Sequence, residues 1–302
     1  MDSPWPAYGF AILSALLWAV SAQILNVGLR RLPASFRIEA IMAGLLFSQL
    51  AGLFTLLQLL DFNSNNRHLS PYLTIAGIFT FPLATGMYYL AGNAFGQRLE
   101  IASQFAKIKP LLSLLLAILV LGEPIERLYS VSSILVVTGV LLFVWSGITG
   151  MVRWNGVIFG SATALFWSLG EVFMGLGFQG QHSLADTFVA LCSATLVSTP
   201  FLLPSFIKLL KKRLIGWHWL WPFIVHGILS FAFAYSLFFT SIEKIGLSAS
   251  VLINAFWPVL ALLLARLIEK FKGQRGDIPA VIWAAAVFLL MGSVIQAFNI
   301  ED

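Results

Sequence analysis

The chain has 302 residues, of which 59% are apolar and 10% are charged, and its mean hydropathy is +0.90. Soluble domains are about 45–50% apolar and about 25% charged, so this composition excludes an ordinary soluble domain and predicts a membrane protein. The net charge of +5 is compatible with nucleic-acid binding, but the basic residues lie in short clusters between apolar segments, as they do in cytoplasmic membrane loops. We therefore expect a lipid bilayer and no nucleic acid as partner.

Ten windows are long and apolar enough to span a bilayer, which requires roughly 20 residues each. In chain order they cover residues 8–28, 38–60, 72–96, 101–121, 128–148, 155–177, 185–207, 217–240, 247–267 and 278–298. The first window has no basic segment before it and is followed by Arg30 and Arg31, so we interpret it as a retained span and not a cleaved signal. The connections are short, and the sequence predicts an all-α membrane protein with ten transmembrane helices.

Internal similarity indicates that five spans have been duplicated. Ala15–Ser21 (ALLWAVS) aligns with Ala164–Gly170 (ALFWSLG) at an offset of 149 residues, and Gly246–Gly273 resembles Glu100–Glu126 about 148 residues earlier. Because five is odd, two such halves have opposite orientations in the membrane. We predict two inverted five-helix repeats around a central cavity, with the binding site near the midplane between them. The predicted repeats are residues 1–150 and 151–302.

The basic residues are distributed unequally between the two sides of the predicted bundle. Loops on the side of the termini carry Arg67, Arg127 and Lys244, whereas those on the opposite side carry thirteen Lys and Arg residues. Cytoplasmic loops are enriched in Lys and Arg, so this count predicts that both termini lie outside. The expected location is the plasma membrane, in bacteria the inner membrane.

The duplicated plan, the Ala-Leu-Leu-Trp and Ala-Leu-Phe-Trp openings, and the segment Pro110–Glu123 (PLLSLLLAILVLGE) resemble the drug/metabolite transporter superfamily in its ten-helix EamA-like branch. Pro258–Lys272 in the second half departs from this pattern because it lacks the Leu-Gly-Glu ending. The outside termini are a second departure, since many such transporters keep theirs in the cytoplasm. The resemblance implies a transporter of small metabolites, often exported, with no prosthetic group. It also implies a cavity lined by the first, third, fourth, sixth, eighth and ninth spans.

Glu171, about five residues past the middle of the sixth span, is the strongest candidate for a functional side chain. An ionisable group in the hydrocarbon costs at least about 2.5–3.5 kcal/mol at the bilayer centre and usually faces a cavity or a partner. We predict that Glu171 binds substrate and couples proton movement, similar to the glutamate in the first helix of small multidrug resistance exporters. The aligned residue in the first half is Ala22, so such a site is asymmetric. The alternative is a carboxylate that only neutralises a lysine.

Lys109 lies near the centre of the fourth span, and Lys107 lies two residues before it. Two residues correspond to about 200° around a helix, so both cannot face one cavity unless Pro110 distorts the turn. We predict that one lysine binds an anionic group such as a carboxylate, and that the other pairs with Glu171 or extends to the interface. A purely structural role stays open for both.

Aromatic and polar residues on the same spans are weaker candidates for substrate binding. Trp18 and Trp167 lie near mid-span, away from the interfacial belt where Trp gathers. The remaining candidates are Tyr88, Tyr89, Gln104, Tyr235, Asn254 and Trp257. For each, interhelical hydrogen bonding or packing is the alternative. His226 has a proton relay as one interpretation, and Glu123 is expected to cap the end of the fourth span.

The sequence predicts a secondary transporter, most simply an exporter, of a small organic metabolite such as an amino acid or other carboxylated solute, working by alternating access. One alternative is proton-coupled efflux of cationic drugs through Glu171; another is a non-transporting receptor or scaffold. A homodimer stays open. We expect no enzyme, because there is no glycine-rich phosphate loop. We expect no metal or cofactor either, because the four histidines lack ligand spacing and Cys192 is the single cysteine.

Overall fold

The computed structural model describes residues 5–60, 70–94, 106, 108–124, 130–150, 154–178, 183–271 and 280–298. These ranges are helical and contain no strand. The elements are α1 (Trp5–Arg30), η1 (Ala34–Phe36), α2 (Arg37–Leu59), α3 (Pro71–Ile78), η2 (Phe79–Ala84), α4 (Thr85–Ala94), α6 (Lys109–Leu121), α7 (Val131–Gly150), α8 (Trp154–Gly177), α9 (Ser183–Lys211), α10 (Trp217–His226), η4 (Gly227–Ala234), α11 (Tyr235–Ile245), α12 (Leu247–Asn254), α13 (Trp257–Phe271) and α14 (Ala280–Phe298). Each of the ten predicted windows contains a described helix.

The lengths and surfaces of these helices are those of a membrane protein. Among the described residues, eight helical segments are long and apolar enough to cross a bilayer, and Lys109–Leu121 and Val131–Leu142 are shorter apolar helices. Large apolar side chains such as Phe201, Leu119 and Leu196 are exposed on the outside of the bundle, where a bilayer would cover them. In lipid every backbone N–H must bond within its own segment, which a helix achieves. The predicted class, an all-α multi-pass membrane protein, is confirmed.

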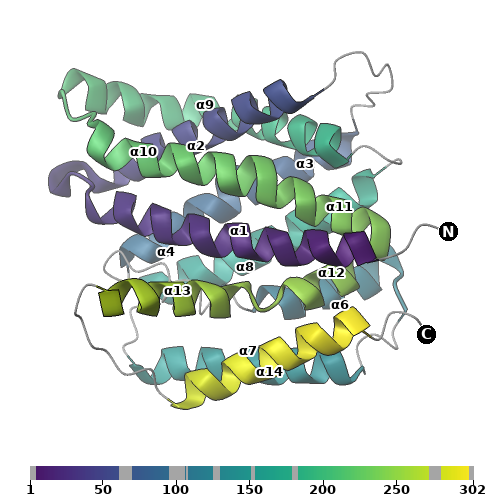
Figure 1. Ribbon diagram of the computed structural model, residues 1–302. Coiled ribbons are helices and arrows are strands. Elements are labelled where there is room, and N and C mark those ends of the chain that lie inside the picture. Colours follow the sequence, from purple (N-terminus) through teal and green to yellow (C-terminus); the bar gives the residue numbers. More distant parts are fainter. Residues whose placement is uncertain are drawn as a thin grey trace.

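The helices run side by side, with α1 between α10–α11 on one side and α13 on the other (Figure 1). Helices α2 and α9 lie toward one edge of the bundle, and the paired α7 and α14 lie at the opposite edge. α1 begins and α14 ends at the same end of the bundle (Figure 1). α1 therefore occupies the middle of the structure.

The first span of each half packs against the other half. α1 contacts α10, η4, α11, α12 and α13, whereas α8 contacts α3, η2, α4 and α6. The two halves are thus interleaved, and their junction lies at the centre of the bundle. The duplication of the two halves and their inverted relation both stay predictions.

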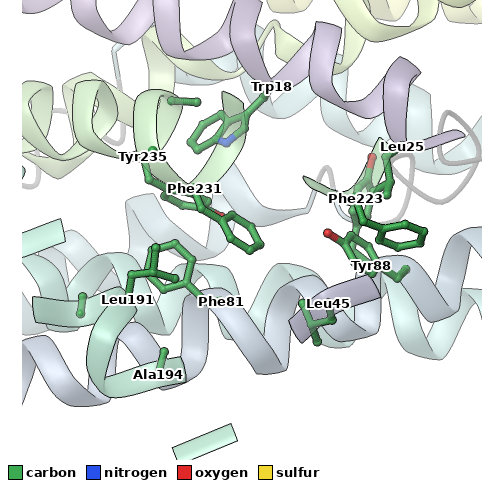
Figure 2. Close-up of a cluster of buried hydrophobic side chains, with 14 of the residues drawn as sticks. Trp18, Leu25, Leu45, Phe81, Tyr88, Leu191, Ala194, Phe223, Phe231 and Tyr235 are labelled. Carbon is green, nitrogen blue, oxygen red and sulfur yellow. The ribbon is translucent and has the colours of Figure 1, made fainter. Parts of the chain in front are cut away.

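The third and eighth spans are each interrupted by a π-helical segment. η2 begins at Phe79 and η4 at Gly227, an offset of 148 residues that falls close to the offset of the sequence repeat. Pro82 lies within η2, where its missing N–H disrupts regular α-helical bonding. The two segments meet through Phe81 and Phe231, whose ring centroids are 5.1 Å apart (Figure 2). π-helical turns are frequent at functional sites, so the junction of η2 and η4 is a candidate position for a functional site.

Two glycines permit close backbone contact at these crossings. A Cβ added to Gly77 would lie 2.0 Å from the carbonyl oxygen of Ala190 on α9, and one added to Gly227 would lie 2.0 Å from that of Ser48 on α2. In membranes small residues allow helix backbones to approach in this way. The two contacts are reciprocal between the halves and fix the third and eighth spans against their neighbours.

Candidate functional site

A small cavity lies between the helices of the first half of the chain and those of the second. Its volume is about 30 Å³, and its walls come from α1, α4, α6, α8, α10, η4, α11 and α13. The lining residues are Trp18, Ser21, Ala22, Thr85, Tyr88, Lys109, Trp167, His226, Ser230, Tyr235 and Trp257. One water occupies at least about 10–15 Å³ by this measure, so the cavity has room for one or two waters. A metabolite requires the helices to separate.

The cavity brings together six of the residues that we predicted to bind substrate, namely Trp18, Tyr88, Lys109, Trp167, Tyr235 and Trp257. Glu171 reaches it through its ion pair with Lys109. Gln104 and Lys107 lie outside the described residues. The binding roles of all these residues stay predictions.

Tyr89 and Asn254 do not line the cavity. The Tyr89 hydroxyl lies 3.2 Å from Ser48 Oγ, and the Tyr89 ring packs against Phe223 and His226. The Asn254 amide donates to Ala11 O at 3.0 Å and to Ser14 Oγ at 2.8 Å, joining α12 to α1. Their observed contacts are the interhelical bonds and packing that the sequence left open as the alternative.

The ion pair between Lys109 and Glu171 is the central feature of the site. Both residues are buried, with exposed fractions of 6% and 1%. Ser113 Oγ donates to Glu171 Oε2 at 2.7 Å, and Ser168 Oγ donates to the Lys109 carbonyl at 3.2 Å. Lys109 is the first residue of α6 and Ser113 the fifth, so the Lys109 and Ser113 contacts of the carboxylate come from the first turns of that helix. The pair therefore links α6 of the first half to α8 of the second.

Aromatic rings surround the Lys109 ammonium. Lys109 Nζ lies 4.9 Å from the ring centroid of Phe238, 5.2 Å from that of Trp18 and 6.0 Å from that of Trp167. A cation within about 6 Å of an aromatic face is attracted by the ring quadrupole, most strongly where water is excluded. Trp167 and Glu171 are four residues apart on α8 and so share one face of that helix.

The rings are held in place by one another. Trp18 packs edge-on against Tyr235 at 4.9 Å and lies 5.3 Å from Phe238, and Tyr88 lies 5.3 Å from Trp167. Figure 2 shows Trp18 beside Tyr235, with Phe231 and Phe81 next to them. Sequence analysis missed Phe238, although it follows Tyr235 by three residues and so lies on the same face of α11.

His226 brings unused hydrogen-bonding capacity to the cavity wall. Its exposed fraction is 4%, and neither ring nitrogen has a hydrogen-bond partner among the described residues. The ring packs against Tyr89 and Phe231, and the nearby hydroxyls of Ser21 and Ser230 also line the cavity. A buried polar group without a partner costs about 1–3 kcal/mol, so His226 favours a polar occupant of this space.

Glu123 joins the fourth and ninth spans. α6 ends at Gly122, which has φ +69°, and Glu123 follows it. The Glu123 carboxylate accepts the N–H of Leu247 at 2.6 Å and that of Ser248 at 3.1 Å. The structure thus places this side chain at the N-terminus of α12, whereas we had expected it to cap its own span.

The fold and the buried charged cavity define a multi-pass membrane protein with a polar site between two interleaved sets of helices. Residues 154–296 match the model of the EamA-like transporter family, which confirms the resemblance over the second half of the chain. The match points to a membrane transporter of small solutes. One solved crystal structure is 16% identical and covers 98% of this chain and 99% of its own, with a TM-score of 0.63, which shows a shared fold. No curated protein matches the chain.

Proposed function

We propose that the protein is a secondary transporter that exports a small organic metabolite bearing a carboxylate, such as an amino acid, by alternating access. The observation that carries this proposal is the buried Lys109–Glu171 ion pair in a cavity between the two halves. A buried ion pair is often no more stable than apolar residues of similar volume, so stability alone is a poor reason for its presence. The ion pair has a function if Lys109 and Glu171 give up each other and bind the charged groups of a solute instead.

In this mechanism the solute carboxylate binds Lys109, and Glu171 is released from its partner. Glu171 then alternates between a proton and a positively charged part of the solute, which couples transport to protons. The unpartnered nitrogens of His226 and the hydroxyls around it would bind further polar atoms of the solute. The aromatic walls would cover its apolar part.

Contacts at opposite ends of the spans are suited to alternating access. Glu123 bonds the start of α12 at one end, and Lys208 on α9 pairs with Glu39 on α2 at the other. A cavity of about 30 Å³ has no room for a metabolite while both contacts hold. Breaking one of them at a time would open the cavity to one side of the membrane only, as inverted repeats achieve by rocking.

The decisive experiment uses purified protein in liposomes, tested against a panel of amino acids and other carboxylated metabolites with and without a pH gradient. Lys109→Ala should abolish transport of carboxylated solutes. In the alternative, efflux of cationic drugs, Glu171→Gln abolishes transport and Lys109→Ala spares it. If the folded protein moves no member of the panel in either direction, the proposal fails.

We also propose that both termini lie outside, as the distribution of Lys and Arg indicates. In a Cys192→Ser background, Asp2→Cys should react with a membrane-impermeant maleimide in intact cells. Lys211→Cys, at the end of α9, should react only after the cells are opened. The reverse pattern would show that the termini are cytoplasmic.

A further inference from the structure

The surroundings of Lys109 Nζ form a cage for a cation. Three rings from three different helices, Trp18 on α1, Trp167 on α8 and Phe238 on α11, lie between 4.9 and 6.0 Å from it. Glu171 closes the cage with a carboxylate. Aromatic cages of this kind are what proteins use to bind organic ammonium groups. Here the cage holds the protein's own side chain.

We propose that this cage, defined by Trp18, Trp167, Phe238 and Glu171, is the subsite for the ammonium group of the solute, and that Lys109 is a tethered occupant which the solute displaces. The inference rests on the proposed function, because the solute carboxylate is what draws Lys109 away. The ligand class is a zwitterion that carries a primary or quaternary ammonium and a carboxylate. Each solute charge then replaces one partner of the resident pair.

The Lys109 side chain is more mobile than the aromatic rings that surround it. Lys109 carries its charge on a flexible four-carbon stem, whereas the rings are fixed by contacts with one another and with Tyr235 and Tyr88. Glu171 keeps the hydrogen bond from Ser113 when Lys109 leaves. The cage therefore retains its shape and its negative charge after its occupant has moved.

Charge balance also favours exchange over simple addition. Leaving Glu171 unpaired in a buried site is costly, and so is leaving Lys109 unpaired. A zwitterion that enters by exchange leaves neither charge without a partner, and the net charge of the site is unchanged. A solute with a carboxylate alone would leave the cage empty and Glu171 dependent on a proton.

Lys208 provides a matched comparison elsewhere in the protein. It also pairs with a carboxylate, that of Glu39, and lies 5.2 Å from a ring centroid, that of Phe36. Its side chain is 52% exposed, and no other ring contact of its ammonium is observed in the described part of the chain. Removing Lys208 therefore exposes no cage.

The test measures binding of choline and of its neutral isostere 3,3-dimethylbutanol to purified protein by equilibrium dialysis. Lys109→Ala should bind choline about tenfold more tightly than the unmodified protein does, and about tenfold more tightly than it binds the isostere. Lys270→Ala, at an exposed residue in the last turn of α13, should bind choline no better than the unmodified protein. Adding Glu171→Gln or Phe238→Leu to Lys109→Ala should remove the gain.

If Lys109→Ala does not fold, Lys109→Ser, whose side chain is also too short to fill the cage, is tested in the same way. A folded Lys109 variant that does not bind choline overturns the inference. Equal binding of choline and its isostere also overturns it, because the space would then be only apolar. These are binding measurements and do not depend on transport. If the unmodified protein transports no solute in liposomes, the proposed function is refuted, whereas the binding results still decide whether the cage binds an ammonium group.

Discussion

The Lys109–Glu171 pair allows stability and transport to be separated. Removing one partner of a buried ion pair costs about 3–5 kcal/mol, because the other charge is left without a partner. In this protein Glu171 would keep the hydrogen bond from Ser113, and Lys109 would keep its contacts with three aromatic rings. The destabilisation caused by each single substitution should therefore lie at the lower end of that range. We expect Lys109→Met and Glu171→Gln each to lower the free energy of unfolding by about 3 kcal/mol.

The double variant should recover most of this loss. With both charges removed, the remaining amide can accept the Ser113 hydroxyl, and we expect a net loss of about 1 kcal/mol or less. The coupling energy between the two sites is then about 5 kcal/mol. Reversible unfolding in mixed micelles of dodecyl maltoside and sodium dodecyl sulfate, followed by tryptophan fluorescence, would measure it. The exposed pair Lys208–Glu39, treated in the same way, should show a coupling of at most about 1 kcal/mol.

Transport by the double variant decides what the pair is for. We expect no transport of a carboxylated solute, although the protein is stable, because neither charge is left to bind the solute. A stable double variant that transports at the unmodified rate would refute the mechanism and leave the pair as a structural contact. Losses that add without coupling would refute the assignment of these two residues as partners.

Three further predictions concern packing, the link between spans and the polar wall. Gly227→Ala should lower the free energy of unfolding by about 2 kcal/mol or more, because its Cβ would meet a backbone carbonyl at 2.0 Å. The control Gly9→Ala, whose Cβ would meet nothing within 4 Å, should be neutral or stabilising by up to about 1 kcal/mol. Glu123→Ala should cost about 1–2 kcal/mol by thermal unfolding through the loss of two bonds to the start of α12, and an unchanged melting temperature would contradict this role. His226→Phe should keep the ring packing and the stability but raise the KM for transport about tenfold, whereas the exposed His218→Phe should leave KM unchanged; a shift in both would indicate a general effect.

The positions of the helices were predictable because lipid limits the possible backbone structures. A long apolar segment that cannot bond to water has to form a helix, so hydropathy alone located the ten windows. The π-helical interruptions at η2 and η4 were harder to predict from the sequence. Pro82 signals a distortion within the third span, but the sequence of η4 contains no proline. Its first residue, Gly227, packs against the backbone of α2, a contact that the sequence does not reveal.

The site was predictable as a set of candidates and not as an arrangement. Trp18 and Trp167 emerged because the repeat aligns them and Trp is unusual at mid-span. The pairing of Glu171 was left open between Lys107 and Lys109, because it depends on the rotation of α6 about its axis, which sequence spacing does not determine. Phe238 was missed because a phenylalanine in an apolar span carries no local signal of a cation beside it.

The alignment of the halves also explains why the cavity has one charged side. The repeat aligns Lys109 with Trp257 and Glu171 with Ala22, and all of these except Glu171 line the cavity directly. One side of the junction thus carries the charged pair Lys109 and Glu171, and the aligned positions on the other side carry the indole of Trp257 and the methyl group of Ala22. Under the predicted duplication, unequal substitutions leave the charges of these four positions on one side of the junction. We therefore expect the charged groups of a solute to bind at the Lys109–Glu171 pair and its other polar atoms at His226.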